Sequence, residues 1–275
     1  AEGYAAMKAL TFTLVAEPPE RLDLSPLTPE RLAGIERRDV ERIQIGMSKH
    51  GSKVGDIFRV AGSDPTNIVF EGGSTRLDLV AQGMRGGSVR LVGNAGAQAG
   101  RAMRGGELTI EGNAGPYAGS GMRGGRLEIT GNAGDHLGAP LVGELAGMNG
   151  GVLIVRGKAG AFAADRMRRG LIAVLKGSGD HAGSRMIAGT LVVAGGTGEM
   201  PGYLMRRGSI LLDRTPARMS PSFVECGAPE SVFAAIIDRH LIAEGILKRP
   251  LLGSAPRKYG GDNAVLGMGE VLFPR

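Results

Sequence analysis

Methionine recurs at a fixed interval through the middle of the chain. Counted from the first member, the steps of this series are 19, 19, 26, 19, 19 and 19 residues, so one step is longer than the others, by seven. Self-similarity at a fixed period is typical of stacked repeats, in which equivalent residues lie above one another. The series consists of Met84, Met103, Met122, Met148, Met167, Met186 and Met205.

Each repeat has the same order of residues. The clearest ones read GMRGGSVRLVGNAGAQAG from Gly83, AMRGGELTIEGNAGPYAG from Ala102 and GMRGGRLEITGNAGDHLG from Gly121. Five alternating residues between two glycine-rich turns predict a short strand and not a helix. Nineteen residues are too few for a propeller blade but suffice for one coil. We therefore expect an all-β fold, a right-handed parallel β-helix of about seven 19-residue coils over residues 62–213, with small capping elements at both ends.

Two columns of equivalent residues are expected to be structural. The methionines are predicted to form an inward apolar ladder, because a thioether fills gaps between uneven coils; a soft-metal stripe is the alternative. Asn94, Asn113 and Asn132 hold the same corner in three successive coils. Asparagine tolerates the left-handed conformation and can hydrogen-bond to its stacked copies, which favours a structural role for this column as well.

A column of arginines is the candidate partner-docking edge. Each follows a methionine of the ladder, so alternation should turn it away from the core. Like charges at coil spacing repel, so acidic groups are expected opposite them, and a solvated or internally paired column, a docking edge and an anion-binding groove remain as alternatives. Breaks at Asn149 and Ile187 argue against a continuous polyanion track. The column consists of Arg85, Arg104, Arg123, Arg168 and Arg206.

The two flanks are expected to cover the ends of the repeats. Residues 1–61 are predicted to form a strand and helix cap, with a strand at 7–15, a helix at 29–38 and strand-like character at 40–60. Residues 214–275 are predicted to hold a C-terminal helix and docking tail. The helix, at 229–247, is either a cap or a docking helix, and the longer step places a seven-residue protrusion within residues 135–146. Its predicted apolar stripe is Val232, Phe233, Ile236, Ile237 and Leu241.

Composition excludes several classes of protein. Glycine, at 48 residues, shows no every-third-residue period, which excludes collagen. Aromatic residues are 4% of the chain, too few for sugar or nucleic-acid stacking platforms. The net charge of +6 comes from 26 arginines and 7 lysines without a basic block, so no nucleic acid is expected. The sequence shows no long apolar run and no leader pattern, so neither membrane insertion nor export is expected. The one cysteine, Cys226, is expected to be partly buried and suits a reducing cytoplasm.

Catalytic constellations are scarce in the sequence. His50, His136, His181 and His240 are far apart, and none has the spacing of a metal-binding motif. His136 and His181 share one coil position two coils apart, roughly 9–10 Å, which is too far for one metal ion. We therefore assign no catalytic, cofactor-binding or metal-binding residue and expect a scaffold.

The repeats closely resemble a known family. The GMRGG and GNAG repeats, with GDNAVLGMGE from Gly261, are similar to the C subunit of formylmethanofuran dehydrogenase and of the bacterial formyltransferase/hydrolase complex. The resemblance extends from PERLAGI at Pro29 through VGDIF at Val54 to the C-terminal tail. The same GXGXG-type repeat also occurs in the C-terminal domain of glutamate synthase, fused there to a far longer chain.

This resemblance implies a role inside a hetero-oligomer. In the family, the hydrolytic chemistry lies on the A subunit, formyl transfer lies on the D subunit, and the C subunit is a building block in contact with the A, B and D subunits. The resemblance implies no cofactor in this chain, and a methanofuran-type carrier and metals on partner subunits. The arginine-rich and alanine-rich composition favours the bacterial complex, which converts formyl-tetrahydromethanopterin to formate. The alternatives are the equivalent subunit of an archaeal tungsten or molybdenum formylmethanofuran dehydrogenase and, more remotely, a stand-alone β-helical carbohydrate-active enzyme.

Overall fold

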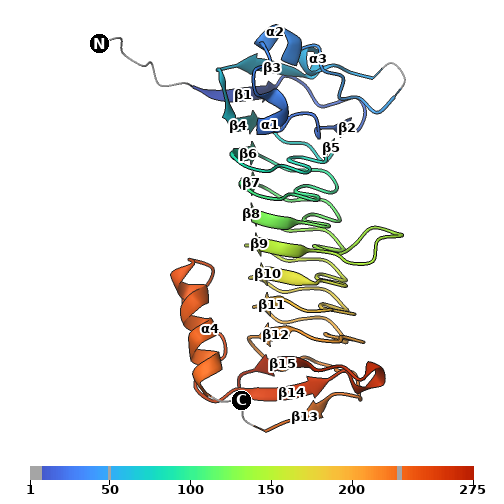
Figure 1. Ribbon diagram of the computed structural model, residues 1–275, viewed down its shortest axis with the longest axis vertical. Coiled ribbons are helices and arrows are strands. Elements are labelled where there is room, and N and C mark those ends of the chain that lie inside the picture. The colour runs from blue at the N-terminus through green and yellow to red at the C-terminus, as the bar shows by residue number, and fades with distance from the viewer. Residues whose placement is uncertain (1–7, 49–50, 228–230) are drawn as a thin grey trace.

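The protein is mostly β-structure, built on one mainly parallel sheet of 13 strands (Figure 1). A computed structural model describes residues 8–48, 51–227 and 231–275. The sheet order is β13-β14-β15-β12-β11-β10-β9-β8-β7-β6-β4-β1-β3, so the strands of successive repeats lie side by side in chain order. These parallel strands are β4 Asp64–Glu71, β6 Ser88–Val92, β7 Glu107–Glu111, β8 Arg123–Ile129, β9 Asn149–Val155, β10 Arg169–Val174, β11 Thr190–Val193 and β12 Ser209–Leu212.

The strand register follows the sequence period. Leu108 of β7 pairs with Leu127 of β8, and Leu127 pairs with Leu153 of β9, across the longer step. A second ladder of isolated parallel bridges joins the repeats away from the sheet and runs through Ala95, Ala114, Ala133, Ala159, Ser178 and Thr197. Each repeat in this span is thus hydrogen-bonded to its neighbours at two places. This double connection fixes which residues lie above one another.

Close stacking explains the glycines of the turns. Gly106 has a φ of +76°, and a Cβ on it would lie 2.5 Å from the carbonyl oxygen of Gly87 in the previous repeat. A side chain at this position would both strain the backbone and separate two repeats. Other left-handed positions carry side chains, including Tyr117, His136, Phe162 and His181. The three asparagines of the predicted corner are not among the positive-φ residues, so the left-handed conformation belongs to other positions of the repeat.

The core lies inside the stack of repeats. All seven methionines of the series are fully buried, together with alternating strand residues such as Leu108, Ile110 and Leu127. At the N-terminal end the core continues into an aromatic cluster, in which the ring centroids of Phe12 and Phe70 lie 5.0 Å apart. The stack therefore buries one continuous apolar column that no single repeat could bury alone.

The N-terminal end carries strands and three short helices. The strands are β1 Ala9–Leu14, β2 Leu22–Asp23, β3 Phe58–Ala61 and β5 Leu77–Asp78; β2 and β5 form a separate two-stranded sheet. The helices are α1 Pro29–Leu32, α2 Arg37–Val40 and α3 Val54–Ile57. The single helix predicted at 29–38 is therefore wrong, because Gly34 takes a φ of +76° and interrupts it. The strand-like prediction for 40–60 misses α3, and Met7 of the predicted first strand lies outside the described residues.

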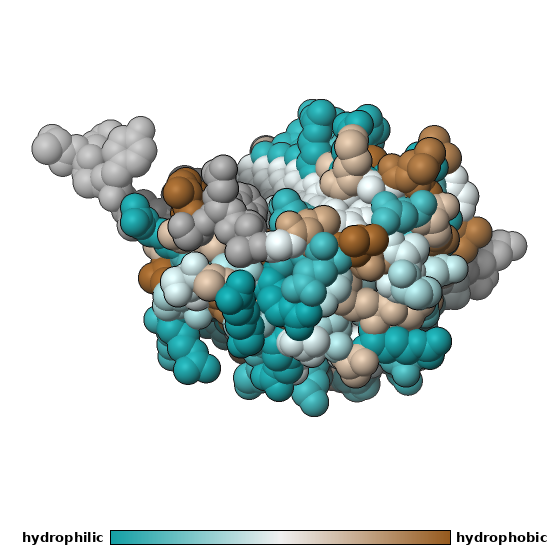
Figure 2. All heavy atoms as spheres, turned by 90° about the horizontal axis from the view of Figure 1, so that it is seen from below, coloured by the Kyte–Doolittle hydropathy of each residue, from teal (hydrophilic) through white to brown (hydrophobic). Residues whose placement is uncertain are grey.

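The C-terminal end adds strands below the last repeat. β15 Gly269–Phe273 continues the parallel sheet beside β12, and β14 Arg257–Gly261 and β13 Val224–Glu225 follow as antiparallel strands. A short 3-10 helix, η1 Asn263–Val265, joins β14 to β15. Cys226 follows the edge strand β13, both residues of which are exposed, and is itself exposed rather than partly buried as expected. In a view onto this end, hydrophobic side chains form separate small patches among hydrophilic ones (Figure 2).

Two features project from the sides of the column. Helix α4 Ser231–Ala243 stands alongside the lower half of the sheet (Figure 1). A loop between β8 and β9 extends away from the column, within the segment where the longer methionine step predicts a protrusion (Figure 1). We call residues 139–147 the insert.

Candidate docking surfaces

The arginine column is exposed along its whole length. The backbone N–H of Arg104 donates to the carbonyl of Met84 at 2.7 Å, and that of Arg123 donates to Met103 at 2.7 Å, so these arginines lie above one another. All five arginines are exposed. Within the described part of the chain, none of their guanidinium groups makes an ion pair or a hydrogen bond with the protein. The acidic neighbours expected on sequence grounds are thus not found among the described residues.

Arginines elsewhere on the repeats do find carboxylates. Arg90 of β6 forms a bidentate pair with Glu111, its Nε lying 2.8 Å from Oε1 of Glu111. The hydrogen bond from Arg90 and its positive charge lower the pKa of Glu111, against an opposing effect of burial. Arg185 similarly forms an ion pair with the buried carboxylate of Asp165. The column thus differs from other arginines of the same repeats in lacking such partners.

The asparagine column is held together through its backbone. Oδ1 of Asn94 accepts from the backbone N–H of Asn113 at 2.9 Å, and Oδ1 of Asn113 accepts from that of Asn132 at 2.8 Å. Oδ1 of Asn132 accepts in turn from the N–H of Lys158. Each side chain therefore bonds to the main chain of the next repeat rather than to another amide side chain.

Two of the histidines belong to a stack of rings. His136 lies between Tyr117, at 4.7 Å, and Phe162, at 5.2 Å, and His181 follows Phe162 at 5.0 Å, as ring-centroid distances. Phe162 thus separates the two histidines, which occupy alternate levels as their sequence positions predict. The spacing of residues 117, 136, 162 and 181 could have indicated this ladder, which sequence analysis missed. His240 lies on α4, and His50 is outside the described residues.

Helix α4 is packed on the outer face of the sheet. Its buried side includes Ala234 and Leu241, with Ile237 partly buried against them. One outward-facing register position runs through all these strands. In β6, β7 and β8 it is held by Arg90, Thr109 and Glu128, whereas from β9 onward it is apolar. The helix therefore lies where the outer face of the sheet becomes hydrophobic. The sheet residues beneath it are Ile154, Ala173, Val192, Leu211 and Leu272.

The predicted stripe of this helix is only partly correct. Val232 and Ile236 are each 60% exposed, so they lie on the side facing away from the sheet. Phe233 lies outside the described side chains. The helix ends at Ala243 rather than at residue 247, because Gly245 adopts a φ of +65° just beyond it.

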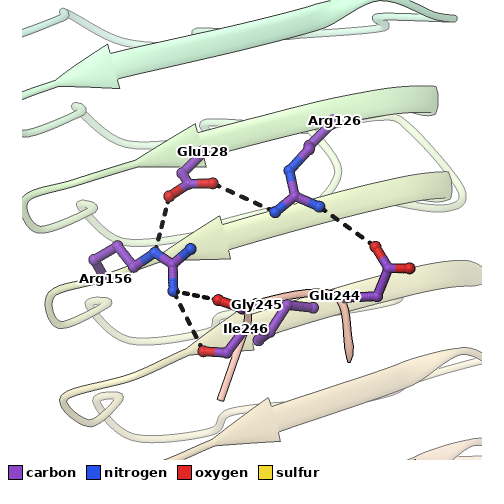
Figure 3. Close-up of polar contacts among 6 residues, drawn as sticks. All are labelled: Arg126, Glu128, Arg156, Glu244, Gly245 and Ile246. Carbon is purple, nitrogen blue, oxygen red and sulfur yellow. Dashed lines mark hydrogen bonds and ion pairs between the residues drawn. The ribbon is translucent and has the colours of Figure 1, made fainter. Parts of the chain in front are cut away.

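Polar contacts pin the C-terminal end of α4 to the sheet (Figure 3). Arg156, just after β9, donates to the carbonyl oxygens of Gly245 and Ile246 at 3.0 and 3.3 Å, while its Nε pairs with Glu128 at 2.8 Å. Arg126 reaches both Glu128 and Glu244. The two carbonyl groups that Arg156 binds belong to the turn just after the helix, so the arginine ties this turn to the sheet. Sequence analysis did not identify this network, because it joins residues about 90 positions apart.

A buried carboxylate holds the segment after α4. Oδ1 of Asp238 accepts from the backbone N–H of Leu251 at 2.8 Å, and Oδ2 accepts from that of Leu252 at 3.1 Å. Asp238 is buried in the same layer as the apolar face of the helix. The helix and the turn that follows it are thereby fixed to one another and to the sheet.

One glutamate, Glu144, holds the insert in place through hydrogen bonds. Oε1 of Glu144 accepts from Arg101 at 2.7 Å, its Oε2 accepts from the backbone N–H of Leu141, and its carbonyl oxygen accepts from Arg166 at 3.3 Å. Burial alone would raise the pKa of Glu144, but the Leu141 N–H and the charged Arg101 outweigh burial and lower the pKa. Glu144 therefore remains a carboxylate at neutral pH and ties the insert to repeats on either side of it.

Two general observations concern sites and membranes. Among the described residues, no group of three or more His, Cys, Asp and Glu side chains is arranged to hold a metal ion. In the described part of the chain, no helix is both long enough and apolar enough to cross a membrane.

Comparison with known proteins identifies the family. Residues 58–226 match the family model described as the GXGXG motif, and these residues contain the stacked glycine repeats. The chain is 43% identical over 264 residues to the C subunit of the formyltransferase/hydrolase complex Fhc of Methylorubrum extorquens, covering 96% of this chain and 99% of the relative. It also matches, with a TM-score of 0.90 and 42% identity, a chain in the crystal structure of the formyltransferase/hydrolase complex (FhcABCD) from Methylorubrum extorquens in complex with methylofuran; the match covers 96% of this chain and 99% of that chain.

The stacked repeats thus place the protein in the class of GXGXG-motif proteins. With matches that span nearly the full length of both chains, it belongs to the family formed by the C subunit of the formyltransferase/hydrolase complex. The resemblance seen in the repeat sequences is confirmed.

Proposed function

We propose that the chain is a non-catalytic scaffold subunit of a multi-subunit formyltransferase/hydrolase complex of one-carbon metabolism. The 43% identity over 96% of this chain and 99% of the relative carries the proposal. A match of this extent includes both ends of the molecule as well as the repeats. In the proposed complex, a formyl group passes from formyl-tetrahydromethanopterin to a methanofuran-type carrier and is released as formate.

The finer architecture is part of the same proposal. We propose a right-handed parallel β-helix of about seven 19-residue coils, in which residues 62–213 form the coils, 1–61 the N-terminal cap and 214–275 the helix and docking tail. Three observations support it: the strand register that follows the repeat, the second ladder through Ala95 to Thr197, and the burial of every methionine of the series. A rigid column of this kind suits a scaffold, because it presents side faces at fixed spacing.

The arginine column is the proposed partner-docking edge. All five side chains are exposed, and none has an acidic partner among the described residues. Other arginines of the same repeats, by contrast, are paired with carboxylates. Guanidinium groups without partners favour carboxylates on another protein, which they bind in a bidentate manner. The methionine and asparagine columns are proposed to be structural.

We place the methanofuran-type carrier, and any metal of the complex, on partners that correspond to the A, B and D subunits. The related crystal structure contains methylofuran within an assembly named for four subunits, which supports a carrier bound by the complex.

Co-purification tests the scaffold role. The chain is expressed with its three proposed partner subunits, and the assembly is analysed by native mass spectrometry and by release of formate from formyl-tetrahydromethanopterin. We expect this chain in the assembly, no formate release by the chain alone, and reduced activity of partners assembled without it. A stable lone chain with its own formyl-transfer or hydrolytic turnover would overturn the proposal.

A further inference from the structure

The tip of the insert exposes two large apolar side chains. Val142 is 100% exposed and Leu145 is 90% exposed, which makes them among the most exposed large hydrophobic residues of the described chain. Isolated exposed apolar residues are common on protein surfaces. Two of them, almost completely in water and three positions apart on one projecting loop, are not explained by packing within the chain.

The insert is held in place, although Val142 and Leu145 at its tip are almost fully exposed. Glu144 lies between the two exposed residues and is bound by Arg101 and Arg166, which come from different repeats. At the base, the N–H of Gly147 donates to the carbonyl of Arg166 at 3.0 Å, and the N–H of Met148 donates to that of Gly138 at 2.7 Å. A loop fixed at its base and next to its tip presents Val142 and Leu145 with little loss of conformational freedom on binding.

The base of the insert lies beside the arginine column. The insert ends at Gly147, two residues before Asn149. Asn149 occupies the position in the arginine column between Arg123 and Arg168. Its backbone N–H donates to the carbonyl of Met122 at 2.7 Å, which places it next to Arg123 in the stack. The one repeat that carries the insert is thus one of the two in which the column lacks its arginine. An apolar projection and a row of free positive charges therefore adjoin on the same edge.

We propose that the insert is an apolar anchor, with Val142 and Leu145 entering an apolar pocket on another subunit of the complex, and that acidic residues around this pocket face the arginine column. The inference rests on the proposed function, because it assumes that the chain docks to other subunits. Charge complementarity selects the occupant: five exposed arginines without acidic partners in the described chain favour a partner with carboxylates around the pocket. Buried apolar anchors surrounded by a polar rim are the usual arrangement of strong protein interfaces.

The test compares a double apolar-to-serine change in the insert with a single one elsewhere. Val142→Ser combined with Leu145→Ser removes the anchor, and Val15→Ser is the control, since Val15 is 53% exposed at the N-terminal end of the molecule, outside the proposed docking tail and the arginine column. Each variant is titrated against an assembly of the remaining subunits prepared without this chain. Thermal unfolding should be nearly unchanged in both variants, because none of the three side chains is buried. The mass of each variant alone is measured as well.

We expect the anchor variant to bind the remaining subunits about 100-fold more weakly, equivalent to about 2.8 kcal/mol at 1.4 kcal/mol per tenfold. The control should bind as the wild type does. Binding of the anchor variant within about threefold of the wild type, or an equal loss in the control, would overturn the inference while leaving the scaffold role intact. A self-associated wild type whose mass falls in the anchor variant, with unchanged binding to the other subunits, would also overturn it in favour of a second copy as the occupant. Failure of the wild type itself to bind would instead contradict the proposed function.

Discussion

At the scale of single residues, several methionines of the series lie close to a glycine in the next repeat. A Cβ on Gly125 would lie 2.7 Å from Cε of Met103, and one on Gly151 would lie 2.8 Å from Cε of Met122. Real Cβ atoms do not approach other atoms so closely in folded proteins. The second glycine of the Met-Arg-Gly-Gly motif is required chiefly by the main chain, because a Cβ on Gly125 would lie 2.6 Å from the carbonyl oxygen of Gly106 and the φ of Gly125 is +83°. The flexible end of the preceding methionine adds to this crowding.

Replacement of Met122 by aspartate should unfold the column. Met122 is fully buried, and a carboxylate there would be surrounded by apolar groups, which costs more than about 3 kcal/mol when no partner compensates it. Met268→Asp is the matched control, because Met268 is 72% exposed and its replacement should change stability by less than about 0.5 kcal/mol. Urea unfolding followed by circular dichroism measures both. Equal stability of the two variants would contradict a stabilising role of the methionine column.

Replacement of Arg123 by alanine should leave the fold intact and weaken assembly. Arg123 has no carboxylate partner in the described chain, so its loss removes no internal contact, and we expect a Tm within about 2 °C of the wild type. If the column faces acidic groups of another subunit, the affinity should fall about tenfold, more at low salt than at high salt. Arg90→Ala is the control, because Arg90 is already paired with Glu111. Unchanged assembly of the Arg123 variant at low salt would count against the docking edge.

Sequence alone identified which residues occur in columns, but not which charges are paired. Alternation after each methionine suffices to place the arginines on the outside. Whether Arg90 or Arg104 meets a carboxylate depends on strand register: Arg90 of β6 lies diagonally opposite Glu111 of β7, whereas Arg104 precedes its strand. The mutual contacts of methionine and glycine were likewise not predictable, because they depend on how far each side chain reaches across to the next repeat.

At the scale of elements, the polarity of the sheet's outer face determines where helix α4 packs. The outer face carries charged residues as far as β8 and apolar residues from β9 onward, and the helix covers the apolar part (Figure 1). At the boundary, Glu128 on the last polar strand and Arg156 just after β9 form the network that holds the end of the helix (Figure 3). The hydrophobic effect thus sets the level at which the helix packs, and the polar network fixes its end.

Replacement of Arg156 by alanine should loosen the end of α4 without unfolding the column. The change leaves the carbonyls of Gly245 and Ile246 without their donor and removes the ion pair to Glu128, a loss of about 1–3 kcal/mol for this half-buried group. Amide hydrogen exchange should rise in the last turn of α4 and in residues 244–247, and remain unchanged in β6 and β7. Arg126→Ala is the control, since Arg126 reaches only Glu128 and Glu244, at 3.5 and 3.8 Å. An equal effect of the two changes would show that the carbonyl contacts do not matter.

Sequence periodicity predicted that α4 exists but not which side it buries. Apolar residues occur on both sides of this helix, with Val232 and Ile236 exposed and Ala234 and Leu241 buried. A buried aspartate, Asp238, lies on the inner side, where its bonds to Leu251 and Leu252 make a charge acceptable. Periodicity cannot anticipate such a partner, because the turn that supplies these two N–H groups follows the helix. The helix predicted at 29–38 is divided into α1 and α2 because Gly34 lies between them with a φ of +76°.

At the scale of the whole molecule, carboxylates with lowered pKa values occur along the full length of the chain. The hydrogen bond from Arg257 and the charge of that arginine lower the pKa of Glu225 against burial. For Asp262, burial would raise the pKa, but the bonds from Ser222 and from the backbone N–H groups of Leu204 and Ala264 outweigh burial and lower it. The set, from the N-terminal end to the C-terminal end, is Glu20, Glu111, Glu144, Asp213, Glu225 and Asp262.

Stability should therefore be lost on acidification and not near neutral pH. A carboxyl group with a lowered pKa in the folded state stabilises the fold fully above its unfolded pKa of about 4, and this contribution disappears as the pH falls through the lowered value. We expect a nearly constant Tm from about pH 8 to about pH 5 and a progressive fall below about pH 4, measured by calorimetry. In a Glu111→Gln and Glu225→Gln double variant the fall should be shallower, because two of the linked protons are removed. A Tm that already drops between about pH 7 and pH 6 would contradict this origin, since it would implicate histidines, and a Tm that is constant down to about pH 3 would show that these carboxylates do not stabilise the column.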